Sequence, residues 1–207
     1  MPLVRNTLAD QAGDDQPSGF EQLLDTLDSP DTAARRLAAR AIAQFPDSSN
    51  ALIDRLEEEA EPSVREAIIT SLAAIADVSA VTALLDCLRS EDAALRNDAI
   101  EALKTAGVQH PGLIQNALQD YDADVRILAI GILESLKHPD VELWLIDLLE
   151  HDPHLNVCAC AVDLLCEIGS ERAVPALEAC LERFPDEAYL RFAVDLAIQR
   201  LRGESAL

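Results

Sequence analysis

Two kinds of apolar helical pattern alternate along the chain and recur together about every 31 residues. Segments of one kind begin at residues 31, 61, 92, 122, 154 and 187, so successive starts lie 30 to 33 residues apart. Each has an apolar residue or Ala at its fourth, eighth and twelfth positions, as in Val125, Ala129 and Leu133, which indicates one face of a helix. An apolar stretch of the other kind lies about ten residues upstream of each, as in residues 20–27.

Turn and helix-start residues separate the two patterns, for example Ser29-Pro30-Asp31 and Glu61-Pro62-Ser63. The repeated unit is therefore a helical hairpin, present six times. A single hairpin of this kind cannot bury its apolar face, so the units are expected to stack into an all-α solenoid over residues 19–203. Residues 1–18 are predicted to form a polar tail, and residues 204–207 a short C-terminal tail.

The pattern Asp-x-x-Val-Arg-x-x-Ala-x-x-x-Leu occurs at Asp122, Val125, Arg126, Ala129 and Leu133. It resembles the HEAT-like repeat, in particular the short bacterial form found in phycobilin lyases and adaptor proteins. The resemblance covers residues 19–203 and implies a right-handed α-solenoid of about six HEAT-like hairpins. It leaves the function open, because such arrays serve as scaffolds, adaptors, chaperones, lyases and a few enzymes.

The resemblance also implies a structural ladder, in which a recurring acid and a recurring arginine tie successive repeats together. An alternative is that the arginines form an anion-binding stripe. We favour the ladder, because an acid recurs four residues before each arginine, within reach of the same helix end. The implied members are Asp31, Arg35, Glu61, Arg65, Asp92, Arg96, Asp122, Arg126, Glu187 and Arg191.

Charge narrows the classes of partner. The chain has 38 acidic and 16 basic residues, a net charge of −22, which argues against nucleic acids and anionic membranes. Neither a secretory signal nor a membrane span is recognisable, and five cysteines are an odd number. We therefore expect a cytoplasmic protein. The run of Glu57, Glu58 and Glu59 is interpreted as a solvated face.

Signatures of known enzymes are not found. Deoxyhypusine hydroxylase resembles this fold and holds iron with His-Glu pairs, but no histidine here is followed by Glu. The chain also contains no Walker loop, G-x-G-x-x-G, C-x-x-C or nucleophile elbow. The leading interpretation is therefore not an enzyme and uses no cofactor.

Outward-facing positions of the second helix become more apolar from the fourth repeat onward. An apolar patch on an acidic protein suggests a protein-binding surface, and the mid-helix Gly131 would allow another backbone to approach closely. Packing between neighbouring helices is the alternative explanation. The predicted binding residues are Ile127, Leu128, Gly131, Ala159, Cys160 and Phe192.

The fifth repeat departs from the ladder pattern. His154 stands where other repeats have an acid, and Cys158 where they have arginine. With His151, these residues are candidate metal ligands, whereas Cys160 should face away from Cys158. A reactive thiol is a second possibility, and the favoured one is a structural role with neither function.

These observations favour a non-catalytic protein-binding adaptor, scaffold or assembly chaperone that uses the inner surface of repeats four to six. Its acidity would suit a partner protein with a basic patch. The alternative is a lyase or cofactor-handling protein resembling phycobilin lyases, with a His/Cys site in repeat five.

Overall fold

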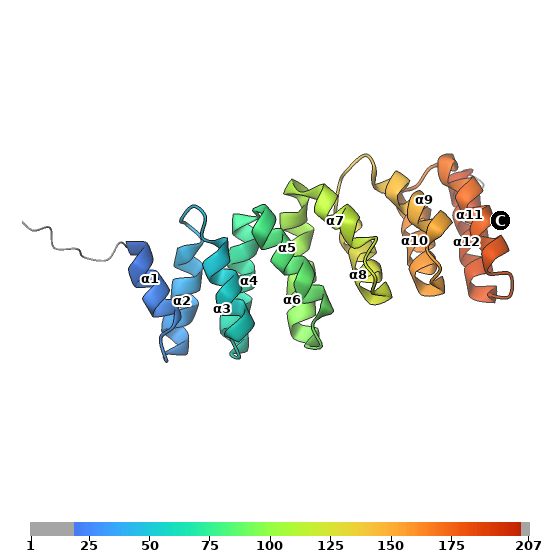
Figure 1. Ribbon diagram of the computed structural model, residues 1–207. Coiled ribbons are helices and arrows are strands. Elements are labelled where there is room, and N and C mark those ends of the chain that lie inside the picture. The colour runs from blue at the N-terminus through green and yellow to red at the C-terminus, as the bar shows by residue number, and fades with distance from the viewer. Residues whose placement is uncertain (1–18, 204–207) are drawn as a thin grey trace, which may run out of the picture.

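The computed structural model describes residues 19–203, and every regular element in this range is helical. Each repeat contributes a first and a second helix (Figure 1). The first helices are α1 (Gly19–Leu27), α3 (Ser49–Glu58), α5 (Val78–Asp86), α7 (Pro111–Ala117), α9 (Val141–His151) and α11 (Val174–Arg183). The second helices are α2 (Thr32–Ile42), α4 (Pro62–Ile75), α6 (Ala93–Ala106), α8 (Ala123–Leu133), α10 (Leu155–Ile168) and α12 (Ala188–Leu201).

The hairpins follow one another along an elongated array (Figure 1). Each second helix packs against the next, and at every junction these contacts are more extensive than those between the two first helices, so the second helices form the more tightly stacked layer. One continuous apolar core runs from Leu27 to Ala197 between the two layers. The expected all-α solenoid of stacked hairpins is therefore confirmed. The tails predicted for residues 1–18 and 204–207 lie outside the described residues.

Aspartates start several of the second helices. Asp31, Asp92 and Asp122 have extended backbones, and each carboxylate accepts a hydrogen bond of 2.9 Å from the backbone N–H two residues later. Such a cap satisfies one of the N–H groups that the first helical turn leaves unpaired. The predicted helix starts arise from this local chemistry.

A second turn recurs immediately before these caps. In five repeats the residue two positions before the cap accepts a hydrogen bond from the cap residue's backbone N–H, at 2.8–3.2 Å. These acceptors are Ser29, Glu59, Ser90, Asp120 and Asp152. The turn fixes the loop between the two helices in these five repeats and presents one polar side chain at the same place in each of them.

None of the helices between residues 19 and 203 combines the length and apolarity that a membrane span requires.

Candidate functional site

The ladder arginines make a three-point contact in repeats one and four. Arg35 donates through Nη1 to the carbonyl of Ser29 in its own loop, and through Nε and Nη2 to Glu59 of the next repeat, at 2.8 and 3.0 Å. Arg126 repeats this arrangement with the carbonyl of Asp120 and with Asp152, at 2.6 and 3.0 Å. Each arginine thus fastens its own loop and grips the following repeat with a bidentate fork.

The partner acids differ from those implied by the resemblance. Asp31 and Asp122 cap their own helices, while Arg35 and Arg126 use acids two residues before the next cap. Only Arg65 binds an implied acid, Asp92 of the next repeat, at 2.9 Å. Asp31 and Asp122 are held by backbone N–H groups at their helix starts, and the loop carboxylates bind Arg35 and Arg126. Glu61 and Glu187 make no such cap.

Glu59 belongs to this network, so its interpretation as part of a solvated face is wrong. The helix ends at Glu58, and the Glu59 side chain turns inward, where only 2% of it is exposed. Arg55 also binds it, at 2.7 Å.

Each set of contacts made by a ladder arginine is called a rung, and the rung of repeat five uses Cys158 and Arg183 in place of that arginine. Cys158 is buried, and its thiol donates to the carbonyl of Asp152 at 3.4 Å, where repeats one, three and four place an arginine Nη1. Arg183 at the end of α11 donates to the carbonyl of Leu149 at 2.6 Å and also to that of Asp152. A guanidinium from the next first helix therefore takes the place of the missing arginine.

The candidate metal ligands of repeat five are not brought together. His151 is exposed and binds the carbonyl of Asp147 at 2.7 Å, and His154 is exposed at the start of α10. Cys158 lies in the core, where its contact with Cys180 and its burial raise the pKa of its thiol. Among residues 19–203 there is no cluster of three or more His, Cys, Asp or Glu side chains suited to a metal ion.

Thiol labelling tests the role of Cys158 directly. We expect Cys158 and Cys180, both buried, to react at least about tenfold more slowly in the native protein than the partly exposed Cys160 and Cys166. Cys158→Ser should leave the native labelling rate unchanged, whereas the control Cys160→Ser should lower it. Labelling with and without urea, followed by mass spectrometry, would give the rates. Fast labelling of Cys158 in the native protein would support the hypothesis that it is a reactive thiol.

A groove between two second helices contains several predicted binding residues. This α8–α10 groove has a volume of about 320 Å³. It is lined by Ile127, Ile130, Gly131, Glu134, Cys160, Asp163, Leu164 and Glu167. Apolar side chains form its walls and carboxylates stand along it, a composition that suits an apolar ligand with hydrogen-bond donors.

The chemistry of the α8–α10 groove is set by its acids and by one glycine. Burial, and then the neighbouring Glu167, raise the pKa of the Asp163 carboxyl. Burial, followed by Asp163, raises the pKa of the Cys160 thiol. A Cβ added to Gly131 would meet nothing within 4 Å, so no packing inside the protein requires glycine there. Glycine is unfavourable in the middle of a helix, and here its missing side chain leaves the groove open.

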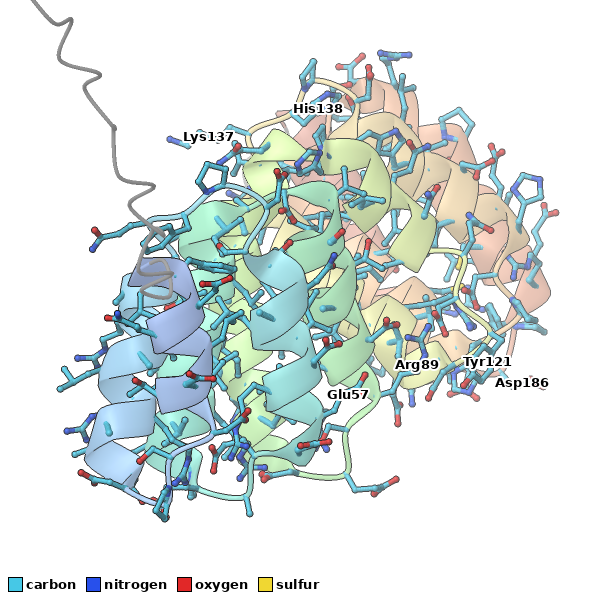
Figure 2. All side chains as sticks on the ribbon, turned by 60° about the vertical axis from the view of Figure 1, so that its left-hand side comes forward. Glu57, Arg89, Tyr121, Lys137, His138 and Asp186 are labelled. Atoms are coloured by element: carbon cyan, nitrogen blue, oxygen red, sulfur yellow. The ribbon has the colours of Figure 1, made fainter. Side chains whose placement is uncertain are left out.

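A second groove lies on the other side of α8 and meets the first at Ile127. This α6–α8 groove has a volume of about 380 Å³ and is lined by Leu88, Arg89, Ser90, Glu91, Arg96, Asp122, Asp124, Ile127 and Leu128. Arg89 is ion-paired with Asp86 and Asp120, and its guanidinium lies 5.7 Å from the centre of the Tyr121 ring. Figure 2 shows Arg89 and Tyr121 next to each other.

The predicted binding residues fall into three places. Ile127, Gly131 and Cys160 line the α8–α10 groove, while Leu128 lines the α6–α8 groove. Ala159 is partly buried against the core, and Phe192 is 67% exposed on α12. The remaining groove residues, among them Glu134, Asp163 and Glu167, were not predicted, because the groove depends on how α8 and α10 face each other. The outward helical positions of Glu134 and Asp163 were the available signal.

The fold and the recurring arginine contacts define a HEAT-type array, and comparison with known families agrees. The profile of HEAT repeats matches residues 20–104 and 111–199. The chain belongs to the HEAT-repeat family.

Three known proteins are similar to this chain in sequence or in fold. The chain is 26% identical to the uncharacterized phycocyanin operon protein Z of Pseudanabaena tenuis over 193 residues, which cover 88% of this chain and 95% of that protein. It is 43% identical to the bilin biosynthesis protein PecE of Nostoc sp. over 98 residues, 46% of this chain and 39% of PecE. A chain in the solved complex of CpcE and CpcF of phycocyanin lyase from Nostoc sp. is 20% identical to this chain, with a TM-score of 0.38. The match covers 97% of this chain and 100% of the matched chain.

These relatives correct the functional expectation. A non-catalytic adaptor, scaffold or assembly chaperone is the wrong interpretation, because the similar proteins are named for bilin biosynthesis and the phycocyanin operon. They support the alternative, a lyase or cofactor-handling protein. The acidity and the absence of enzyme motifs had favoured an adaptor, but a ligand site built from ordinary outward-facing residues would leave no short motif.

Proposed function

We propose that the protein handles bilins as a lyase-type protein and binds the bilin in the α8–α10 groove. The observation that carries this proposal is the similarity to phycocyanin operon protein Z over 88% of the chain. The local similarity to PecE, at 43% identity, supports the same substrate class.

The groove suits the chemistry of a bilin, an open-chain tetrapyrrole with flat apolar rings and pyrrole N–H donors. Ile127, Ile130 and Leu164 provide apolar surface, and the carboxylates of Glu134 and Asp163 provide acceptors. Its volume of about 320 Å³ lies within the range of small-molecule sites, and its open sides let a longer ligand extend beyond it.

The groove's own thiol is unsuited to hold the bilin covalently. A raised pKa keeps Cys160 protonated at neutral pH, and the thiolate is the nucleophilic form. The bilin would therefore be held by packing and hydrogen bonds, and an acceptor protein would supply any thiol that forms a lasting bond. This arrangement suits transfer of a substrate rather than storage of a cofactor.

Delivery of a bilin requires a protein partner, and we place its contact on α12. Tyr189, Phe192 and Leu196 are exposed along one side of this last helix, which no further repeat covers within residues 19–203. Aromatic residues are enriched at protein interfaces. A net charge of −22 would favour a partner with a basic patch and would speed its approach.

Substitution of Gly131 tests whether the α8–α10 groove binds bilin. Titration of the protein with biliverdin, followed by visible absorption, should give saturable binding. Gly131→Phe should weaken binding about tenfold or more by filling the groove, because its ring would project into open space.

Gly131→Ala is the matched control, and it should bind like the natural protein. It should also raise the free energy of unfolding by up to about 1 kcal/mol, because alanine favours an exposed helical position. Equal biliverdin affinity of the Phe and Ala variants would reject this groove, and absence of binding in the natural protein would reject the proposed function.

A further inference from the structure

The ladder has an open rung beside the proposed bilin groove. Arg96 donates through Nη1 to the carbonyl of Ser90 at 2.5 Å, as Arg35 and Arg126 do in their own loops. The Nε and Nη2 edge of Arg96, however, has no hydrogen bond or ion pair with any residue in the described range 19–203. The equivalent edges of Arg35 and Arg126 each hold a carboxylate, at 2.6–3.0 Å.

The reason for the open rung is that nearby acids are already engaged. Asp120 occupies the loop position whose counterparts bind Arg35 and Arg126, but it pairs with Arg89 and accepts the N–H of Asp122. Asp122 caps α8 by accepting the N–H of Asp124, and it forms no ion pair within residues 19–203, unlike Asp92, which caps α6 and also binds Arg65. Arg96 is therefore fixed through Nη1 by the loop carbonyl, and it is one of the residues that line the α6–α8 groove.

We propose that Arg96 binds a propionate carboxylate of the bilin, a role that rests on the proposed function. The closed rungs show what this fork is built to hold, since each places a carboxylate on the same two nitrogens. At Arg96 no side chain of the described range fills that position, so a carboxylate of the ligand completes the rung.

The two grooves together match the distribution of groups on a bilin. No basic residue lines the α8–α10 groove, so a propionate has no cationic partner there. Both grooves are lined by Ile127, and α8 carries lining residues from Asp124 to Glu134, a run of about 15 Å at the helical rise. The rings can lie over α8 while one propionate reaches Arg96 beside the apolar Leu88 and Leu128.

The acids in the α6–α8 groove give selectivity. Glu91, Asp122 and Asp124 line it together with Arg96, and the other lining cation, Arg89, is already paired with Asp86 and Asp120. A small free anion therefore meets repulsion and gains only the fork of Arg96. A bilin also gains apolar contact over two grooves, which offsets that repulsion. Inorganic phosphate should therefore fail to compete with the bilin at millimolar concentration.

A comparison of biliverdin with its dimethyl ester tests the assignment, because the ester keeps the rings and removes both carboxylates. The natural protein should bind biliverdin about tenfold more tightly than the ester, because one charge-assisted bidentate contact stabilises a complex by roughly that factor. Arg96→Gln should reduce this preference to less than about twofold while leaving the affinity for the ester unchanged. Arg96→Lys, which keeps the charge and loses the fork, should give an intermediate preference.

Arg191→Gln is the matched control. Arg191 also binds its own loop carbonyl, of Pro185 at 2.9 Å, and lies on α12 outside both grooves, so its loss removes the same charge and the same loop contact. This variant should keep the tenfold preference. Helical content and melting temperature would verify that each variant is folded. If Arg96→Gln does not fold, the same comparison can be made with Arg96→Lys.

The outcomes separate the two proposals. If the natural protein binds biliverdin and its ester equally, or if Arg96→Gln keeps the preference, the role of Arg96 is wrong and bilin handling stands. If Arg96→Gln weakens both ligands alike, Arg96 supports the groove but does not recognise carboxylate. If the natural protein binds neither ligand, the proposed function fails together with this inference.

Discussion

Replacing Arg126 with alanine is expected to lower the free energy of unfolding by about 3–5 kcal/mol. Only 10% of its side chain is exposed, and 6% of that of Asp152. Removing the guanidinium would leave the Asp152 carboxylate buried without a cation, while the carbonyl of Asp120 would lose its donor. The cost of an unpaired buried charge dominates this effect, more than the attraction within the pair.

Neighbouring groups compensate only slightly. The backbone N–H of His154 donates to the same carboxylate, and Arg183 binds the carbonyl of Asp152 rather than its side chain. Urea unfolding followed by circular dichroism would measure the change. Arg40→Ala, which removes an exposed arginine, should change stability by less than about 0.5 kcal/mol.

Asp152→Asn combined with Arg126→Ala provides a further control, since the amide removes the buried charge and keeps an acceptor for His154. The double variant should recover part of the lost stability. A cost of less than about 1 kcal/mol for Arg126→Ala alone would show that this rung does not hold repeats four and five together.

Replacing Glu59 with glutamine should make the protein less stable at pH 7 and less sensitive to acid. Burial alone would raise the pKa of Glu59, but hydrogen bonds from Arg35 and Arg55 lower it from 4.5 to about 2. Since the folded pKa lies below the unfolded one, the carboxylate's contribution is fully present above about pH 4.5. It is lost as the pH falls from there towards 2.

At pH 7 we expect Glu59→Gln to cost about 3 kcal/mol, because Arg35 and Arg55 both lose their charged partner. Between pH 5 and 2 the natural protein should lose more stability than the variant, so that the two curves approach each other. Glu58→Gln, one residue away on the exposed helix end, removes the same charge and should follow the natural protein within about 0.5 kcal/mol. Parallel curves for Glu59→Gln and the natural protein would contradict the assignment.

The hairpins and their stacking could be predicted from the sequence because they depend on local signals. The period of the apolar residues and the aspartates at the helix starts were enough to place six repeats. The partners of the arginines could not be predicted in the same way. Arg126 passes over Asp122, four residues earlier, and binds Asp152 of the next repeat, a choice set by the loop turn and by the stacking of repeats.

The candidate site was predicted only in part for the same reason. Helical spacing identified Ile127 and Gly131 as outward-facing, but a groove exists only where two neighbouring helices leave space between them. The open edge of Arg96 was equally hidden, because it results from Asp120 binding Arg89 instead. The local sequence pattern predicts which side chains of a helix face outward, whereas the proposed ligand site also depends on the side chains of the adjacent repeat.

The replacement of an arginine by Arg183 in the fifth rung limits how this array could evolve. Solenoids commonly grow and shrink by duplication or deletion of single units, since each unit contacts only its neighbours. Repeat five carries Cys158 in place of the arginine and depends on a guanidinium donated by repeat six. Loss of repeat six would therefore remove a donor to the loop of repeat five, whereas Arg35 and Arg126 donate to their own loop carbonyls and use the next repeat only for its acid.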